Sequence, residues 1–383
     1  MDEAFALYVH VPWCRHVCPY CDFNVHAHPR PPEADYAAAL ARELAAWVDA
    51  PAFAGRRIAS VYVGGGTPSL FSAPAIARVL AAADATFGIA PDAEVTLEAN
   101  PGTVTRATLD GYRSAGVNRL SLGAQSFTPR LLHALGRDHD PGDVEAATAA
   151  ARGAGFANVS LDLIFAVPGS TLAEWRRDLE CAIALEPAHV SAYALTFEAG
   201  TPYHAWRASG RLHAVDEDLE AAMAEHTAER LPAAGLARYE ISSWARPGRA
   251  SSHNQRYWDG SSYLGIGAGA HSFAADPPAT ERWSNVRNPQ AYMDGVTTGG
   301  TAVAERHPLD DERARADFAF TGLRRLAGID TRRFAARFGR PFAEAFPHVV
   351  GLVRDGLLEW AGDALRLTAR GLRFADTVAA TFV

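Results

Sequence analysis

Residues 8–23 read YVHVPWCRHVCPYCDF and hold three of the four cysteines of the chain, Cys14, Cys18 and Cys21. The cysteines directly follow an apolar segment, residues 7–11, that is typical of a buried strand. Thiolates are the usual ligands of iron–sulfur clusters, and a cluster of four irons that takes three thiolates keeps one iron open. The spacing therefore predicts a [4Fe-4S] cluster with an iron at which a second molecule binds.

A structural zinc site is the alternative that the same cysteines allow. Zinc is commonly held by three thiolates and one imidazole, and a fourth ligand is available nearby from His16, His26 or His28. The spacing favours the cluster, and a closed zinc site needs no partner motifs elsewhere in the chain. The fourth cysteine, Cys181, lies in an apolar helical pattern at residues 175–185, which indicates a small core residue.

The composition of the 383 residues excludes several classes of function. The formal net charge is −8, so the chain offers no basic surface for nucleic acid or for an anionic membrane. Its first residues lack the basic start and apolar core of a signal peptide, and no apolar run is long enough to span a bilayer. We therefore expect a cytoplasmic protein, in a reducing compartment where clustered thiols bind metal and form no disulfides.

Apolar segments alternate with helical patterns in the first half of the chain. Six of them have the length and composition of buried strands: residues 7–11, 58–63, 94–98, 119–122, 158–164 and 189–195. Strands with helical crossovers form parallel sheets, and six strands are too few for a closed barrel of eight. The pattern predicts an α/β fold with an open, partial parallel β/α barrel. Glu43 lies outside the apolar stripe of the first crossover, which comprises Tyr36, Leu40, Leu44 and Trp47.

Polar residues lie where these strands end. The cysteines follow the first strand, and the ends of the others hold Gly64-Gly65-Gly66-Thr67-Pro68, Glu98-Ala99-Asn100-Pro101, Gln125, Asp162 and Tyr193-Ala194. Active sites of parallel β/α barrels form at the carboxyl ends of the strands. We therefore expect these residues to converge on one site beside the cysteines, which the zinc alternative does not predict.

Several of these residues carry a specific chemical expectation. The glycines of residues 64–67 allow close backbone approach, and their amides are candidates to bind a carboxylate or an amine of a ligand. Glu98 and Asp162 lie within apolar strands, where an unpaired carboxylate is costly, so each needs a ligand hydroxyl or a protein donor as its partner. Arg137 is either a clamp for a carboxylate or an ordinary solvated arginine.

A second group of chemically versatile residues follows the predicted barrel. The segment His253-Asn254-Gln255-Arg256-Tyr257-Trp258 precedes a glycine-rich run that ends at His271. Histidine ligates haem iron and aromatic rings stack on flat macrocycles, so this segment is a candidate haem site. The alternative is that these side chains belong to the core, since most histidines ligate nothing.

Residues 301–383 have the pattern of a separate small domain that follows a first unit of residues 1–300. Two helical patterns and then a β-ribbon suggest a winged helix, at residues 310–326, 331–338 and 357–367. Winged helices often bind DNA, but residues 309–383 hold 12 Arg against 10 Asp and Glu. That balance does not support a phosphate-binding face.

Together these motifs resemble the radical SAM group that contains oxygen-independent coproporphyrinogen III dehydrogenase and the HemW-type haem chaperones, and the similarity covers nearly the whole chain. The resemblance implies a partial barrel of radical SAM type in which Cys14, Cys18 and Cys21 hold the cluster. It implies that S-adenosylmethionine binds the open iron, where an electron cleaves it to a 5′-deoxyadenosyl radical. The implied contacts of this cofactor are Tyr8, Tyr20, Gly65 and Glu98. Positions that hold a second S-adenosylmethionine in the dehydrogenase correspond to Gly66, Thr67, Gln125, Arg137, Asp162 and Ala194.

Two departures separate this chain from the dehydrogenase. That enzyme has a further cysteine two residues after the triplet, where this chain has Phe23, and a longer segment before the cluster, where this chain has 13 residues. The segments around the cysteines and at residues 253–258 instead resemble the chaperone branch, in which the His-Asn-x-x-Tyr-Trp element is associated with haem binding.

The resemblance thus implies a chaperone that carries haem as its cargo and delivers it to haemoproteins. Its expected haem contacts are His253, Asn254, Tyr257 and Trp258. A transient contact with membrane proteins is compatible with this role, and nucleic acid is not an expected partner. Oxidative decarboxylation of coproporphyrinogen III and a zinc-stabilised binding module are the two alternatives.

Overall fold

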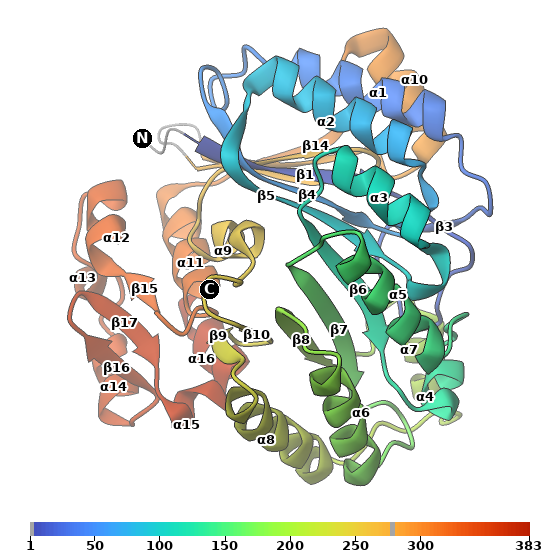
Figure 1. Ribbon diagram of the computed structural model, residues 1–383. Coiled ribbons are helices and arrows are strands. Elements are labelled where there is room, and N and C mark those ends of the chain that lie inside the picture. The colour runs from blue at the N-terminus through green and yellow to red at the C-terminus, as the bar shows by residue number, and fades with distance from the viewer. Residues whose placement is uncertain (1–3, 276–279) are drawn as a thin grey trace.

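The computed structural model describes residues 4–275 and 280–383, and a curved sheet of twelve strands runs through them (Figure 1). The strand order is β14-β13-β12-β11-β1-β4-β5-β6-β7-β8-β10-β9. Six consecutive strands are parallel, namely β1 (Ala4–Val11), β4 (Arg57–Gly65), β5 (Ile89–Ala99), β6 (Arg119–Gln125), β7 (Val159–Phe165) and β8 (His189–Ala194). They coincide with the six strands that the sequence predicts, so the partial parallel barrel is confirmed.

Helices cover the outer face of the parallel strands (Figure 1). The crossover helices are α1 (Glu33–Ala46), α2 (Ala73–Phe87), α3 (Arg106–Ser114), α5 (Pro141–Gly153) and α6 (Leu172–Ala184). Capping boxes at Thr105, Asp140 and Thr171 begin α3, α5 and α6, because each side chain satisfies an amide of the first helical turn. Helices outside this set are α4 (Pro129–Ala134), α7 (Pro202–Ala208), α8 (Glu217–Ala233), α9 (Ser252–Trp258) and α10 (Pro289–Gly299).

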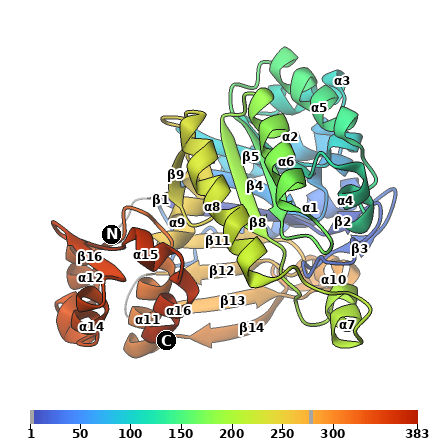
Figure 2. The same ribbon diagram turned by 90° about the horizontal axis from the view of Figure 1, so that it is seen from below.

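Further strands, most of them antiparallel, extend the sheet at both ends, and no sequence pattern predicted them. β11 (Tyr263–Ile266) pairs with β1 in parallel, and β12 (His271–Ala274), β13 (Glu281–Asn285) and β14 (Val303–Pro308) follow in antiparallel order. At the other end β8 pairs with β10 (Ser243–Ala245), which pairs with β9 (Ala237–Glu240). Figure 2 shows β11–β14 as a layer beside the parallel strands. The barrel stays open because its end strands pair with these additions and not with each other.

The buried stripe of α1 is wider than predicted, because Glu43 is fully buried on it. Its carboxylate accepts hydrogen bonds from the amide of Gly267 at 2.9 Å, from Asn285 Nδ2 at 2.7 Å and from the Tyr292 hydroxyl at 2.5 Å. Burial raises the pKa of Glu43 to about 7. The prediction that this residue lies off the buried stripe was wrong, and the carboxylate connects α1 to the β11–β12 turn and to α10.

The C-terminal residues form a small unit around their own apolar core, in which Phe318, Phe334 and Phe342 are buried. Its helices are α11 (Asp311–Gly322), α12 (Thr331–Phe338), α13 (Phe342–Ala345), α14 (Val349–Arg354), α15 (Ala369–Leu372) and α16 (Ala375–Ala379). Its strands β15 (Ile329–Asp330), β16 (Leu358–Ala361) and β17 (Ala364–Leu367) form an antiparallel sheet. The predicted helices followed by a β-ribbon are present.

The last strand of the large sheet lies beyond the predicted domain boundary at residues 300 and 301. β14 pairs with β13 along most of its length. We therefore propose that the C-terminal unit begins after β14. In the part of the chain that the structure describes, no helix is both long and apolar enough to cross a bilayer.

Candidate functional site

The three clustered cysteines lie on a loop that is closed at its base next to β1. Two short strands, β2 (Trp13–Cys14) and β3 (His26–Ala27), pair there in parallel. Two backbone hydrogen bonds close the loop, from the His26 amide to the Pro12 carbonyl at 2.7 Å and from the His28 amide to the Cys14 carbonyl at 2.8 Å. Its three cysteines are free thiols, and they stand at the carboxyl end of β1, as the sequence predicts.

Two of the thiols contact residues that the resemblance assigns to cofactor binding. Thr67 Oγ1 donates to Cys14 Sγ at 3.4 Å, and Arg137 Nη1 donates to Cys18 Sγ at 3.8 Å. Burial raises the pKa of the Cys14 thiol, and it raises the pKa of Cys21 to about 11. These two thiols are therefore protonated at neutral pH unless a metal displaces the proton, as metal ligation by cysteine requires.

A cavity of about 460 Å³ lies beside the thiols at the carboxyl ends of the parallel strands, and all three cysteines line it. Most of the predicted cofactor-binding residues also line it, namely Tyr20, Gly65, Gly66, Thr67, Glu98, Gln125, Arg137, Asp162 and Ala194. Asn254 reaches the same cavity from α9, whereas Tyr8 lines an adjoining cavity. The structure thus brings these residues together, and what each of them binds stays a prediction.

The backbone amides at the glycine-rich end of β4 donate hydrogen bonds to other groups of the protein. The amide of Gly65 donates to Glu98 Oε2 at 2.9 Å, and the amides of Gly66 and Thr67 each donate to a backbone carbonyl at 2.8 Å. These three amides thus have partners within the protein, and their binding to a ligand stays a prediction. The glycines have a different use, since a Cβ on Gly66 would lie 2.6 Å from the carbonyl oxygen of Trp13. They let the cysteine loop approach the end of β4.

Glu98 and Asp162 have protein donors as partners. The Tyr62 hydroxyl donates to Glu98 at 2.7 Å, and the Ser121 hydroxyl donates to Asp162 at 2.8 Å. Burial raises the pKa of Glu98 to about 7, and it also raises the pKa of Asp162. Both residues still line the cavity, where the remaining lone pairs of each carboxylate can accept a hydrogen bond from a ligand.

Two arginines reach the cavity with part of their hydrogen-bonding capacity unused. Arg137 is half-buried and donates from Nη2 to the Gly123 carbonyl at 3.1 Å, so it is not the solvated arginine of the ordinary alternative. Arg119, at the start of β6, is buried 3.8 Å from Glu94. Within the described residues the Nε atom of each arginine has no hydrogen-bond partner. The sequence pattern gives no signal for Arg119, because a charged residue at the start of an apolar segment suggests a solvated strand end.

The cluster and the zinc alternative place different demands on the positions of the three thiols. Across residues 4–275 and 280–383, no group of three His, Cys, Asp or Glu side chains is placed to hold a single metal ion. His16, one of the candidate zinc ligands, hydrogen-bonds to the Gly136 carbonyl at 2.6 Å and lies 4.0 Å from Cys18 Sγ. In a cluster each cysteine binds a different iron, so the three sulfurs need not surround one point. An anionic cofactor group would also satisfy the free Nε of Arg137.

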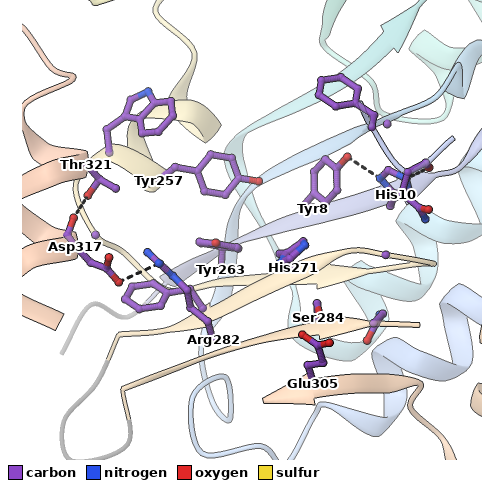
Figure 3. Close-up of a pocket in the computed structure, with 18 of the residues that line it drawn as sticks. Tyr8, His10, Tyr257, Tyr263, His271, Arg282, Ser284, Glu305, Asp317 and Thr321 are labelled. Atoms are coloured by element: carbon purple, nitrogen blue, oxygen red, sulfur yellow. Dashed lines mark hydrogen bonds and ion pairs between the residues drawn. The ribbon is translucent and has the colours of Figure 1, made fainter. Parts of the chain in front are cut away.

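A larger cavity of about 700 Å³ adjoins the first one, between strands β11–β13 and helix α11 (Figure 3). Four residues line both cavities, and they are Asp22, Phe23, Gly65 and Glu98. The walls of the larger cavity carry the rings of Tyr8, Tyr257, Trp258, Tyr263, His271, Phe273 and Phe318. They also carry the guanidinium groups of Arg282 and Arg287. The same walls carry Arg337 and the carboxylates of Asp22, Glu98, Glu305 and Asp317, so this space combines flat apolar surfaces with charged groups of both signs.

His253 lines neither cavity and is fully buried. Its Nδ1 lies 3.0 Å from Ser60 Oγ, and its Nε2 lies 2.8 Å from the Tyr257 hydroxyl. Burial lowers the pKa of His253 to about 3, so the ring is neutral. This arrangement does not support His253 as an iron ligand, because neither ring nitrogen is free. The ring instead orients Tyr257, which lines the larger cavity together with Trp258.

The burial of a neutral His253 predicts a pH dependence of stability. The ring binds a proton near pH 6.5 in the unfolded chain but only near pH 3 in the folded chain. Its contribution to stability is present above pH 6.5 and is lost as the pH falls, at up to about 1.4 kcal/mol per pH unit. In the variant His253→Asn, urea unfolding should therefore give a smaller loss of unfolding free energy between pH 6.5 and pH 5 than in the wild type. The same exchange at the exposed His213 should leave the slope unchanged, and equal slopes in wild type and His253→Asn would contradict the prediction.

Comparisons with known proteins cover both parts of the chain. Residues 8–182 match the family model of the radical SAM superfamily, and residues 309–374 match the HemN C-terminal domain. The chain is 38% identical to the heme chaperone HemW of Mycobacterium tuberculosis (strain H37Rv), over 100% of this chain and 95% of that relative. It is 34% identical to the heme chaperone HemW of Bacillus subtilis, over 98% of both chains. The solved structure of coproporphyrinogen III oxidase (HemN) from Escherichia coli, a radical SAM enzyme, matches with a TM-score of 0.84 over 100% of this chain and 90% of that one. At 24% identity this likeness shows the fold.

Proposed function

Because this chain belongs to the HemW family within the radical SAM superfamily, we propose that it is a haem chaperone that binds haem and delivers it to haemoproteins. The cavity of about 700 Å³ supports the proposal most directly. Its aromatic rings suit a flat macrocycle, and its arginines suit the carboxylates that haem carries. The cavity also shares a wall with the cysteine site, so cargo and cofactor would lie side by side.

We propose that Cys14, Cys18 and Cys21 hold a [4Fe-4S] cluster and that S-adenosylmethionine binds in the cavity of about 460 Å³. Membership of the radical SAM superfamily implies both groups. When bound, the cluster supplies single electrons. The side chains around it have simpler tasks: Thr67 and Arg137 each donate a hydrogen bond to one of the sulfurs, Thr67 to Cys14 and Arg137 to Cys18.

We propose that Phe23 and Glu98 separate haem from S-adenosylmethionine and help to position both. Phe23 lines both cavities, and its side chain is largely exposed. Its apolar ring can therefore contact a ligand in either cavity. Glu98 is held by Tyr62 and Gly65, and its carboxylate is positioned to accept a hydrogen bond from a ligand hydroxyl. Neither task requires that the cofactor be consumed.

The purified chain is expected to bind haem and to transfer it to an apo-haemoprotein, without converting coproporphyrinogen III under reducing conditions with S-adenosylmethionine present. The reason is that Phe23 stands where the dehydrogenase has a further cysteine. Haem binding is measured by absorption titration, transfer by separating donor from acceptor, and turnover by chromatography of the porphyrins. Failure to bind haem would remove the proposal, and production of protoporphyrinogen IX would make the enzyme alternative correct.

The enzyme alternative rests on the likeness to the HemN structure, which at 24% identity extends to the fold alone. The zinc-stabilised module has no supporting geometry among the described residues. The acceptor haemoproteins, a transient contact with membrane proteins and the cytoplasmic location stay predictions.

A further inference from the structure

We propose that haem binds in the cavity of about 700 Å³ with His271 as a ligand of its iron and Arg287 as the partner of one of its carboxylates. The inference rests on the proposed function, because it names the site of the cargo. The sequence motif at residues 253–258 suggests His253 as the iron ligand. The inference assigns this role instead to His271, which lies on β12, one of the strands that the sequence did not predict.

The register of these strands brings the lining side chains to one face of the sheet. His271 lies opposite Ser284, and Phe273 lies opposite Arg282. Phe273 is also the partner of Tyr263 on the neighbouring strand. Directly paired residues, and residues two apart on one strand, point to the same face. All five side chains share that face, and all five line the cavity.

Helix α11 supplies the opposite wall. Ala314, Asp317, Phe318 and Thr321 line the cavity, and their spacing places them on one stripe of the helix. The rings of Phe318 on this wall and Phe273 on the sheet are largely buried, and the Arg337 guanidinium lies 5.8 Å and 5.7 Å from their centroids. The rings of Tyr8, Tyr257 and Tyr263 also line the cavity, and a planar macrocycle can stack on such rings.

His271 is the imidazole of the cavity wall with free nitrogens. It is exposed at the start of β12, and within the residues that the structure describes its ring takes part in no hydrogen bond. The other histidine on the wall, His10, hydrogen-bonds at 2.9 Å to Tyr8 and at 2.9 Å to the Asn24 carbonyl. Figure 3 shows His271 in the cavity between Tyr8 and Tyr257 on one side and Ser284 on the other. A neutral imidazole with an accessible nitrogen is a common axial ligand of haem iron.

Arg282 and Arg287 of the cavity wall differ in whether a carboxylate of the protein already pairs with them. Arg282 forms an ion pair with Asp317 at 2.9 Å, which Figure 3 also shows. Arg287 is exposed at the cavity wall, and in the described parts of the chain no carboxylate pairs with it. Glu305 lies opposite Ser284 on the neighbouring strand, and it pairs with His307 at 3.2 Å. Arg287 is therefore free to bind a carboxylate of haem with two parallel hydrogen bonds.

The iron ligand is tested by haem titration of the full-length chain and its variants. His271→Ala should weaken haem binding by about tenfold or more and should lose the absorption spectrum of the imidazole-ligated iron. Added imidazole should restore that spectrum, because it fills the vacated position. His213→Ala, at an exposed histidine that lines neither cavity, should match the wild type in affinity and spectrum. Unfolding curves that coincide for all variants exclude a folding defect as the cause.

The outcomes separate this inference from the proposed function. If the wild type binds haem and His271→Ala binds it with the same affinity and spectrum, His271 is not the ligand, while the chaperone proposal stands. Loss of the spectrum in His253→Ala alone would likewise overturn the inference. If the wild type itself binds no haem, the proposed function fails.

The carboxylate contact is tested with two forms of the cargo. Arg287→Glu should weaken the binding of haem several-fold, because the new charge repels the haem carboxylate. The same variant should bind haem dimethyl ester, which lacks the charges, as well as the wild type does. An equal loss for both ligands, or no loss for either, would overturn the assignment of Arg287.

Discussion

Replacing Cys14, Cys18 or Cys21 singly by Ala is expected to reduce iron binding from about four irons per chain to a small fraction of that value. Each thiol supplies one ligand of the cluster. Thr67 and Arg137 donate to the sulfurs and are not ligands for iron, and His16, whose Nε2 lies 4.0 Å from Cys18 Sγ, hydrogen-bonds to the Gly136 carbonyl. The measurement is the iron and sulfide content of the anaerobically reconstituted protein.

Cys181 provides the matched control. It lies on α6 in the outer layer, away from the cysteine loop, and packs against the large apolar core. Cys181→Ala should therefore keep the full iron content. Wild-type protein that takes up stoichiometric zinc and no iron would contradict the cluster, as would full iron content in any of the three single variants.

The exchange Gly66→Ala is expected to remove most of the iron although it removes no ligand. The added Cβ would lie 2.6 Å from the carbonyl oxygen of Trp13, a backbone atom at the base of the cysteine loop. Contacts that short do not occur, so the loop and the end of β4 must move apart. Such a shift displaces Cys14, which directly follows Trp13 in β2. Iron content and the midpoint of thermal unfolding should both fall.

Gly299→Ala is the control for this exchange. Gly299 ends α10, and nothing lies within 4 Å of the Cβ that the substitution adds. Its iron content and thermal stability should equal those of the wild type. If Gly66→Ala also keeps the iron content and thermal stability of the wild type, the close approach of the cysteine loop to the end of β4 is not needed for the cluster site.

The parallel core and the cysteine site could be predicted because their signals are local. A strand such as residues 58–63 is a continuous apolar run next to a helical period, and the residues after each strand must meet at one edge of a parallel sheet. Fold topology then placed Gln125, Asp162 and Ala194 beside cysteines from which they are distant in sequence.

The remaining features depend on partners that no local pattern reveals. Strand β13 contains Arg282 and Ser284 within five residues, so it has no apolar run to identify it. Glu43 is a polar residue in a helix, and its burial is possible only because Gly267, Asn285 and Tyr292 supply donors from far along the chain. The same holds for the larger cavity, whose walls come from β11–β13 and α11.

Strand β1 precedes both of its partners, β4 and β11, in the chain, so its pairing is completed late. One edge of β1 pairs with β4, and the other pairs with β11, where Val9 lies opposite Ile266. Until residue 266 has left the ribosome, that second edge has unpaired amides and carbonyls, which attract other strands. At about 5–20 residues per second, synthesis from β4 to β11 takes on the order of ten seconds or more. Throughout this interval the nascent chain carries a free strand edge directly beside three unligated thiols, so this segment is where protection during translation matters most.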